Sequence, residues 1–239
     1  DVPSAQVKSS VLLAGLHASG RTTVIEPAAT RDHTERALSA FGVTVDRDGL
    51  QVSVGGGQTL SARTLQVPGD VSGSAFWGAL AAGLPDSLVQ LDNLGLNPSR
   101  IALLDILRRC GAQVDVVIDS EAAGEPIGRV TISCAERRSF SITPEEVPAV
   151  IDELPALGAL GTLLPDGSTM EVRGAAELRV KESDRISALA AGFRAMGAEI
   201  TEYPDGFRID ARPLRGGTTV DAVGGHPLSV VFAIPACGA

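Results

Sequence analysis

The chain repeats one succession of sequence features three times along its 239 residues, and this repeat constrains the fold more than any other property. Each copy opens on a Val-Pro step that leads into a stretch of small apolar residues. A short β-branched run follows the apolar stretch and is typical of a strand. A chain of this kind folds as copies of one supersecondary unit. The Val-Pro steps are Val2-Pro3, Val67-Pro68 and Val147-Pro148.

The second half of each copy begins with an amphipathic segment that predicts a helix. The three segments are residues 32–41, 99–110 and 183–196. Each is closed by a glycine, Gly42, Gly111 or Gly197, at the position where a helix needs a left-handed residue. An alternating strand follows, and the chain then reverses through turn residues into a partner strand. The reversals fall at 48–49, 124–128 and 204–206.

This order of elements predicts an α/β fold of repeated βαβαββ modules, in which mixed sheets carry helices packed against them. The first helix of each module is apolar or small almost all round, so we expect it to be the most buried. Because aromatic residues make up only 3% and glycines number 27, the core must consist mainly of Ala, Leu, Val and Ile. A fourth module is expected to begin at Val220-Asp221 and to supply a first helix. The sequence shows no linker, so any domain boundary is expected at a module junction.

Charge and composition exclude several classes of protein. A net charge of −9 argues against a general binder of nucleic acid or of anionic membranes, which must neutralise phosphates over a broad surface. The three scattered cysteines fit neither a disulfide framework nor a zinc site, and they suit a reducing compartment. No apolar run reaches the roughly 18 residues that span a bilayer. We therefore expect a soluble, cytoplasmic protein.

The two helix starts of the first module are candidate anion sites, because unpaired backbone N–H groups and the positive end of the helix dipole meet there. One start carries Ser4, Ala5 and Gln6, and the other carries Thr30 and Arg31. Together these residues could bind a phosphate group. In the alternative interpretation, Ser4 and Thr30 are ordinary N-caps and Arg31 is a solvated cation.

The third module also carries charged residues at its helix starts. Asp152 lies in an otherwise apolar stretch, where a carboxylate either caps the helix or is held for general-base or hydroxyl-binding work. The run from Lys181 to Arg185 opens the second helix, and its alternative interpretation is a solvated first turn. The equivalent point of the second module, residues 97–100, is expected to be a plain cap and turn. The extra charges of the other two modules therefore favour a functional role.

The sequence carries no signature of a metal or nucleotide site. Its histidines share no metal-ligand spacing, and the motifs of nucleotide-binding loops, serine hydrolases and zinc proteases are absent. Glycines 55–57 follow a strand but open no helix, which predicts a hairpin loop rather than a phosphate cradle. The histidines are His17, His33 and His226.

Three separated motifs occur in order along the chain: SAQVKSSVLLAGL at 4–16, TRDHTERAL at 30–38 and LRVKESDRI at 178–186. Together with the repeat, they resemble the 5-enolpyruvylshikimate-3-phosphate synthases, a family of enolpyruvyl transferases of the shikimate pathway. The resemblance implies the inside-out α/β barrel of that family. It also implies transfer of the enolpyruvyl group of phosphoenolpyruvate to the 5-hydroxyl of shikimate 3-phosphate, with release of phosphate and without a metal or organic cofactor.

The same resemblance implies a role for each motif residue. Asp152 would accept the proton of the 5-hydroxyl, and Glu182 would assist proton transfer at the methylene carbon, with Lys181 as the third catalytic residue. Gln6 and Arg185 would contact phosphoenolpyruvate, Arg185 through the carboxylate. The residues expected to hold shikimate 3-phosphate are Ser4, Ala5, Gln6, Thr30, Arg31, Asp152 and Lys181.

The chain departs from the family pattern in two ways. Gly225 and Pro227 occupy the positions of an Asp and an Arg at the start of the family's last module, which removes one carboxylate contact. The similarity also covers only a little over half of a family member and leaves out the N-terminal part and the C-terminal end. We therefore expect residues 1–66 to be the last module of a first, lid domain. Residues 67–239 would be two modules and the start of a third of the second domain.

Three hypotheses follow. The favoured one is an incomplete enolpyruvyl transferase, monomeric and inactive or nearly so alone, which the missing N-terminal half would complete in trans. The second is a non-catalytic module that binds shikimate 3-phosphate, because the phosphoenolpyruvate contact at Pro227 is lost. The third is the related enzyme that acts on UDP-N-acetylglucosamine, which the residues at 30–33 and 181–185 disfavour.

Overall fold

The computed structural model describes residues 3–180, 183–222 and 226–239, without the side chains of His226 and Pro227. The chain divides into two compact units, of which unit 1 includes two segments of the second module. The predicted division between residues 66 and 67 into parts of two domains stays a prediction. Unit 1 comprises Asp1–Pro68, Gly95–Ser99 and Ile118–Gly128, and unit 2 comprises Gly69–Leu94, Arg100–Val117 and Arg129–Ala239.

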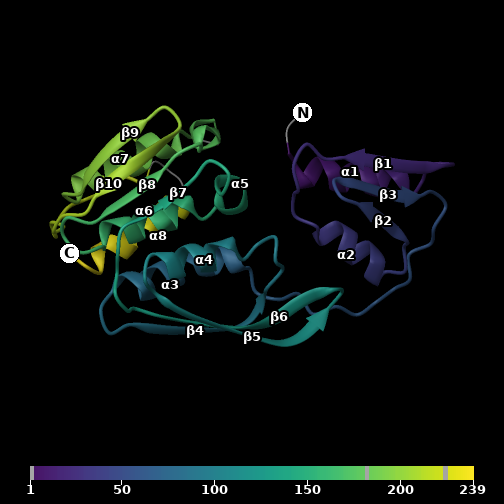
Figure 1. Ribbon diagram of the computed structural model, residues 1–239, viewed down its shortest axis with the longest axis horizontal. Helices are drawn as coiled ribbons and strands as arrows, with labels where there is room; N and C mark the ends of the chain where they lie inside the picture. Colours follow the sequence, from purple (N-terminus) through teal and green to yellow (C-terminus); the bar gives the residue numbers. More distant parts are fainter. Residues whose placement is uncertain (1–2, 181–182, 223–225) are drawn as a thin grey trace. The chain divides into compact units, whose positions relative to one another are not determined.

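Unit 1 is built on the first module (Figure 1). Its three strands form one sheet in the order β1-β3-β2, and both pairs are antiparallel. Its elements are α1 (Ala5–Gly15), β1 (Arg21–Ile25), α2 (His33–Ala40), β2 (Val45–Asp48) and β3 (Gln51–Gly55). The core consists of the buried side chains Leu12, Leu16, Leu38, Val43, Val52 and Val54.

The second module supplies the next sheet, in the order β4-β6-β5. The strand expected before its first helix is reduced to one parallel bridge between Gly69 and Leu94. The tip of the β5–β6 hairpin is the segment that clusters with unit 1. The elements are α3 (Val71–Gly83), β4 (Leu88–Gly95), α4 (Ala102–Arg109), β5 (Gln113–Ala122) and β6 (Glu125–Ser133).

The third module forms the sheet β7-β8-β10-β9 in unit 2. Here the strand that precedes the first helix is present, and β7 pairs with β8 in parallel. The first helix is broken into two pieces, α5 and α6. The elements are β7 (Phe140–Ile142), α5 (Val147–Val150), α6 (Leu154–Thr162), β8 (Thr169–Val172), the 3-10 helix η1 (Ala176–Arg179), α7 (Arg185–Ala195), β9 (Glu199–Tyr203) and β10 (Gly206–Asp210).

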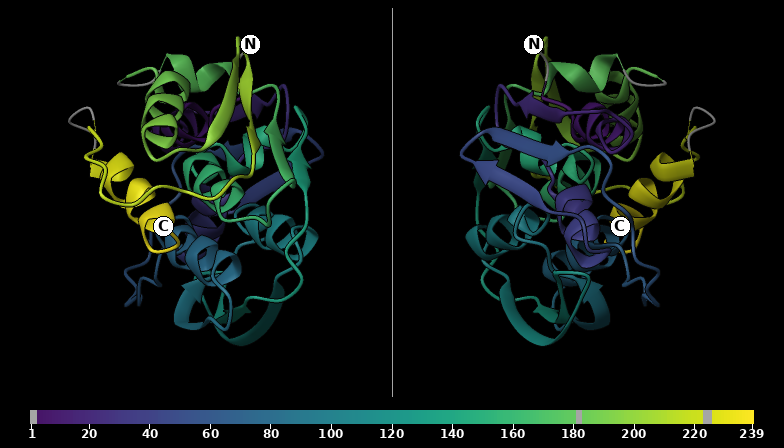
Figure 2. Two further views of the ribbon diagram at one scale, coloured as in Figure 1. Left: turned by 90° about the vertical axis from the view of Figure 1, so that its left-hand side faces the viewer. Right: turned by 90° about the vertical axis from the view of Figure 1, so that its right-hand side faces the viewer.

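The three sheets share one topology, which confirms the repeated module. In each sheet the hairpin strand lies between the strand after the first helix and the strand after the second helix. The glycines predicted to end the second helices, Gly42, Gly111 and Gly197, have φ angles of 89°, 102° and 92°. The first helix expected of a fourth module is α8 (His226–Ala236), the yellow helix of Figure 2.

Burial of the first helices follows the prediction in unit 2 but not in unit 1. Every residue of α6 is buried, and α6 packs against α3 and α8. By contrast, α1 exposes Val7, Val11 and Leu13 by 61%, 39% and 48%. The expectation that each first helix is the most buried is therefore wrong for α1, since no other first helix lies beside it in the described part of unit 1.

Glycines 55–57 do not form the predicted hairpin loop. They follow β3, where Gly56 N donates to Gly20 O and Gly57 N donates to Leu16 O, both at 2.8 Å. A Cβ atom on Gly56 would lie 1.8 Å from Ala18 O. Glycine is required there because two backbone segments approach closely.

Candidate functional site

The first candidate group stands at the start of α1. Ser4 is the N-cap residue: its Oγ accepts a hydrogen bond from Val7 N at 3.3 Å and donates one to Gln6 Oε1 at 3.4 Å. Ser4 and Ala5 are half-buried, and Gln6 is exposed. The capping role of Ser4 is confirmed, and the ligand roles of the three residues stay predictions.

The second group ends the segment between β1 and α2. Thr30 and Arg31 are both half-buried. Asp32 occupies the N-cap position of α2, so the alternative in which Thr30 caps this helix is wrong. Thr30 instead donates its hydroxyl proton in a hydrogen bond to Glu26 Oε1.

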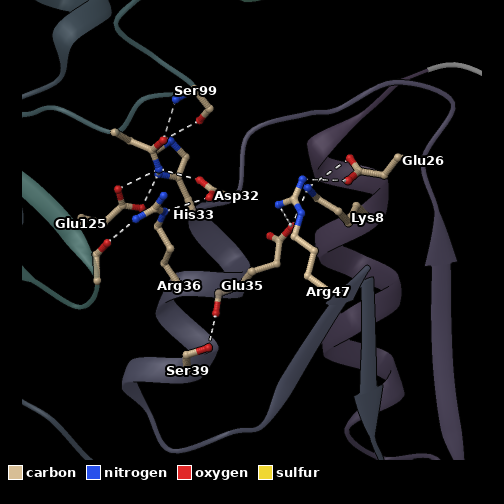
Figure 3. Close-up of polar contacts among 12 residues, drawn as sticks. Lys8, Glu26, Asp32, His33, Glu35, Arg36, Ser39, Arg47, Ser99 and Glu125 are labelled. Carbon is tan, nitrogen blue, oxygen red and sulfur yellow. Dashed lines mark hydrogen bonds and ion pairs between the residues drawn. The ribbon is translucent and has the colours of Figure 1, made fainter. Parts of the chain in front are cut away.

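Asp32 and His33 contact two segments of the second module within unit 1 (Figure 3). Asn97 Nδ2 donates to Asp32 Oδ1 at 2.7 Å and to Glu125 Oε2 at 2.8 Å, and His33 Nδ1 lies 2.7 Å from Glu125 Oε1. Arg36 Nε donates to Asp32 Oδ2 at 2.9 Å. Burial raises the pKa of Asp32, but the hydrogen bonds from Arg36 and Asn97 outweigh it and leave this pKa below its ordinary value.

The turn expected at residues 97–100 is present at 98–100, but the N-cap position of α4 is Ile101, so the expected cap is wrong. Asn97 is only 1% exposed, and its Oδ1 accepts hydrogen bonds from Ser99 N at 2.8 Å and from Ser99 Oγ at 2.7 Å. Its amide group therefore has partners on both its oxygen and its nitrogen. The contacts of Asn97 hold residues 95–99 to the start of α2.

A buried ion cluster joins α1 to α2 (Figure 3). Lys8 is 1% exposed, and its Nζ lies 3.1 Å from Glu26 Oε1 and 2.7 Å from Glu35 Oε1. Arg47 of β2 lies 4.0 Å from Glu26 Oε2 and 3.8 Å from Glu35 Oε1. Two cations and two carboxylates are thus paired, which is the condition under which buried charges are tolerated.

In unit 2, the break between α5 and α6 holds two adjacent carboxylates. Asp152 is exposed, whereas Glu153 occupies the N-cap position of α6 and is 3% exposed. Glu153 Oε1 accepts a hydrogen bond from Ser72 Oγ, which accepts one from Arg100 Nη2. Burial raises the pKa of Glu153, and it outweighs the opposing Ser72 hydrogen bond and Arg100 charge.

The third motif is described only at its flanks, because Lys181 and Glu182 lie outside the described residues. Asp184 is the N-cap residue of α7 and accepts a backbone hydrogen bond at 3.0 Å. Arg179 Nη1 donates to Asp184 Oδ2 at 2.7 Å. Asp184 therefore caps the helix. Arg185 is the first residue of α7 and is half-buried.

Little of the predicted start of the fourth module falls on described residues. Gly225 lies outside the described residues, as does the side chain of Pro227, so the effect of these departures stays a prediction. Across the described ranges, no cluster of three or more His, Cys, Asp or Glu side chains is placed to hold a metal ion. No helix in the same ranges has the length and apolar character needed to cross a membrane.

The sequence profile of EPSP synthase (3-phosphoshikimate 1-carboxyvinyltransferase) matches residues 1–239. The chain belongs to the EPSP synthase family. A 3-phosphoshikimate 1-carboxyvinyltransferase of Synechococcus sp. (strain JA-3-3Ab) is 45% identical over 100% of this chain and 54% of its own length. One of Acidithiobacillus ferrooxidans (strain ATCC 53993 / BNL-5-31) is 46% identical over 98% of this chain and 54% of its own length.

Solved structures agree with this family. The EPSP synthase of Acinetobacter baumannii has a TM-score of 0.91 at 38% identity, covering 99% of this chain and 55% of its own. The enolpyruvyl transferase NikO from Streptomyces tendae shares the fold, with a TM-score of 0.66 at 20% identity over 94% of this chain and 51% of its own. The predicted fold class is confirmed. The chain spans about half the length of the EPSP synthase relatives it matches.

Sequence reasoning missed the residues that support the EPSP synthase motifs. Asn97, Arg100 and Glu153 carry no motif of their own, and their partners lie far away along the chain. Lys8 did leave a signal, because it is the only charged residue of the apolar stretch at 7–16. A single lysine in an apolar helix indicates a buried partner of opposite charge.

Glu153→Gln should make unit 2 less sensitive to rising pH. Because the pKa of Glu153 is raised, the folded state binds more protons than the unfolded state, and stability falls as the pH rises from 4.5 through the folded value. Glutamine keeps an acceptor for Ser72 but carries no charge. The variant should therefore gain stability over the native chain across this window, measured by urea unfolding with the fluorescence of Trp77.

Glu146→Gln provides the matched control in the same unit. Hydrogen bonding to Arg109 lowers the pKa of Glu146, so this carboxylate stabilises the fold above its unfolded pKa and that stability is lost as the pH falls. Its substitution should lower stability at neutral pH, the opposite sign. Parallel pH curves for the Glu153 variant and the native chain would contradict the inferred shift.

Proposed function

We propose that this chain is part of an enzyme that transfers the enolpyruvyl group of phosphoenolpyruvate to the 5-hydroxyl of shikimate 3-phosphate and releases phosphate. This transferase reaction belongs to the shikimate pathway of aromatic amino-acid biosynthesis. The observation that carries the proposal is the match of the family profile to all 239 residues. We place the reaction in the cytoplasm and expect the complete enzyme to be a monomer that needs no metal or organic cofactor.

In unit 1, we assign Ser4, Ala5, Gln6 and Arg31 to shikimate 3-phosphate. The N-terminus of α1 supports this assignment, because its backbone N–H groups and its dipole favour an anion. Gln6, which is exposed beside Ser4, also contacts phosphoenolpyruvate in this proposal. The predicted contact of Thr30 with the phosphate is not part of this set.

In unit 2, we assign the proton-transfer and carboxylate-binding roles. Asp152 accepts the proton of the 5-hydroxyl, and its exposure leaves it open to a substrate. Lys181 binds the hydroxyl groups, and Glu182 assists proton transfer at the methylene carbon. Arg185, at the first position of α7, pairs with the carboxylate of phosphoenolpyruvate.

The proposed reaction balances as an addition followed by an elimination. The 5-oxygen bonds to the central carbon of phosphoenolpyruvate, its proton leaves to a base, and the methylene carbon gains a proton. In the second step the phosphate leaves and the new methyl group loses a proton, which restores the double bond. Both steps require a positioned acid and base, and both substrates are anions that need local cations.

The exposed face of α1 supports completion of the enzyme in trans. The equivalent helix α6 is buried because α3 and α8 pack against it, whereas α1 leaves Val7, Val11 and Leu13 exposed. We propose that the N-terminal part of the family, which this chain does not match, covers this face. Residues 1–66 then belong to the first domain and residues 67–239 to the second.

Reconstitution tests the proposed function. The chain is mixed with the part of the Synechococcus relative that lies outside the matched region, and phosphate release is followed with both substrates. We expect no turnover by the chain alone and clear turnover by the mixture. Asp152→Asn should lower turnover roughly 10²- to 10⁴-fold without preventing assembly. Asp166→Asn, which changes an exposed carboxylate paired with Arg212, is the control and should leave turnover unchanged.

The same assay separates the two competing functions. A mixture that assembles and binds shikimate 3-phosphate without releasing phosphate from phosphoenolpyruvate would support the non-catalytic module, for which Pro227 is the motivating departure. Turnover with UDP-N-acetylglucosamine in place of shikimate 3-phosphate would support the third hypothesis. Either outcome would contradict the proposed reaction.

A further inference from the structure

We propose that Thr30 is a positioning residue, which acts through Glu26 to hold Arg31 at the start of α2, and that its hydroxyl does not bind the substrate phosphate. This inference rests on the proposed function, because it concerns the residues assigned to shikimate 3-phosphate. It replaces the role that the family resemblance implies for Thr30.

The hydroxyl of Thr30 is already committed within unit 1. It donates to Glu26 Oε1, the same oxygen that lies 3.1 Å from Lys8 Nζ. The Glu26 side chain is only 3% exposed, and its other oxygen has no hydrogen-bond partner among the described residues. Glu26 is therefore a buried carboxylate that depends on Thr30 and Lys8 for its close contacts.

A count of protons decides between the two roles of Thr30. A threonine hydroxyl has one proton to donate, and a carboxylate such as Glu26 can only accept. An anionic phosphate oxygen also only accepts. To donate to the phosphate, Thr30 would have to break its hydrogen bond to Glu26. The buried Glu26 oxygen would then lose its hydroxyl partner, which costs free energy.

The hydrogen bond between Thr30 and Glu26 joins the two ends of segment 26–30, which directly precedes Arg31. Glu26 is held at the end of β1 by its own N–H, which donates to Leu50 O at 2.9 Å, and by the ion pair with Lys8. Thr30 lies four residues later, and Arg31 follows directly. Lys8 also pairs with Glu35 of α2 at 2.7 Å (Figure 3). The cluster thereby holds α1 and the segment that leads into α2 together.

A double-mutant cycle tests this role by titration of the reconstituted mixture with shikimate 3-phosphate. Thr30→Val, Glu26→Met and the double variant should each weaken binding roughly ten- to hundredfold, and the double variant should be no weaker than the worse single variant. Thr30→Ser keeps the hydroxyl and should bind as the native chain does. Thr23→Val is the matched control, because it removes a hydroxyl bonded to Ser53 at 2.9 Å within the sheet of unit 1.

Direct binding of the phosphate by Thr30 predicts different results for the same variants. If the Thr30 hydroxyl binds the phosphate directly, Glu26→Met will leave binding unchanged or strengthen it, and the effects of the two substitutions will add. Either result would overturn the proposal.

A second measurement does not depend on substrate binding. Amide order parameters at residues 28, 29 and 31 should fall in Thr30→Val and Glu26→Met and stay at the native values in Thr30→Ser. If these order parameters do not change, the positioning role is wrong. If they fall while neither the native mixture nor any variant mixture binds shikimate 3-phosphate, the proposed function fails and the structural coupling stands.

Discussion

Lys8→Met should lower the free energy of unfolding of unit 1 by about 3–5 kcal/mol, because it leaves buried carboxylates without their cation. The Lys8 ammonium lies 3.1 Å from Glu26 and 2.7 Å from Glu35, whose side chains are 3% and 9% exposed. Arg47, at 4.0 and 3.8 Å from these carboxylates, is 38% exposed and cannot replace both contacts.

The free energy of unfolding must be measured with a probe that lies in unit 1. The chain has one tryptophan and one tyrosine, Trp77 and Tyr203, and both lie in unit 2. We therefore specify hydrogen exchange of the amides of Val52 and Val54, which are buried in the central strand β3.

Two further variants give this prediction its controls. Asp46→Asn breaks the exposed pair between Arg21 and Asp46, at 2.8 Å, and should cost less than about 1 kcal/mol. Adding Glu35→Gln to Lys8→Met removes one unpaired charge and should restore part of the loss. A Lys8→Met chain as stable as the Asp46 variant would show that the cluster is not paired as described.

Gly111→Ala should lower the stability of unit 2 by about 4 kcal/mol or more, since two separate costs meet at this residue. Gly111 has a φ of 102°, where a residue with a Cβ atom is strained. A Cβ atom at this position would also lie 1.8 Å from Glu136 O, so the backbone at residue 136 would have to move. Urea unfolding followed by circular dichroism and by the fluorescence of Trp77 measures the loss.

Gly167→Ala separates the two costs. Gly167 has a φ of 81° and lies in the same unit, but a Cβ atom there would meet nothing within 4 Å. Its substitution should therefore show only the backbone cost, about 1–2 kcal/mol. Equal losses for the two alanine variants would mean that the contact with Glu136 O contributes nothing.

The fold was largely predictable because the repeat consists of local sequence patterns. Turn residues, β-branched runs and helix-ending glycines act over a few neighbours, so they identify the modules without knowledge of the tertiary contacts. The prediction was wrong for the burial of α1, because burial depends on which helices lie alongside. It was also wrong for glycines 55–57, where the loop that approaches Gly56 comes from residues 16–20.

The candidate site was predictable only in part. Ser4, Arg31, Asp152 and Arg185 stand at helix starts, or beside them, as the motifs indicate. Their supporting partners were not predictable, since Asn97 reaches Asp32 across 65 positions of sequence and Ser72 reaches Glu153 across 81. No local pattern encodes contacts over such separations.

The sequence by itself determined the order of elements, the strand topology implied by the repeated module and the left-handed glycines, because backbone sterics and hydrophobic periodicity are local properties. Only the tertiary structure decided what those residues meet. The sequence predicts a left-handed glycine at Gly111, but the fold alone brings Glu136 O against it. Likewise, the sequence shows one lysine in an apolar helix, and the fold alone surrounds Lys8 with two carboxylates, since burial makes each charge require a partner.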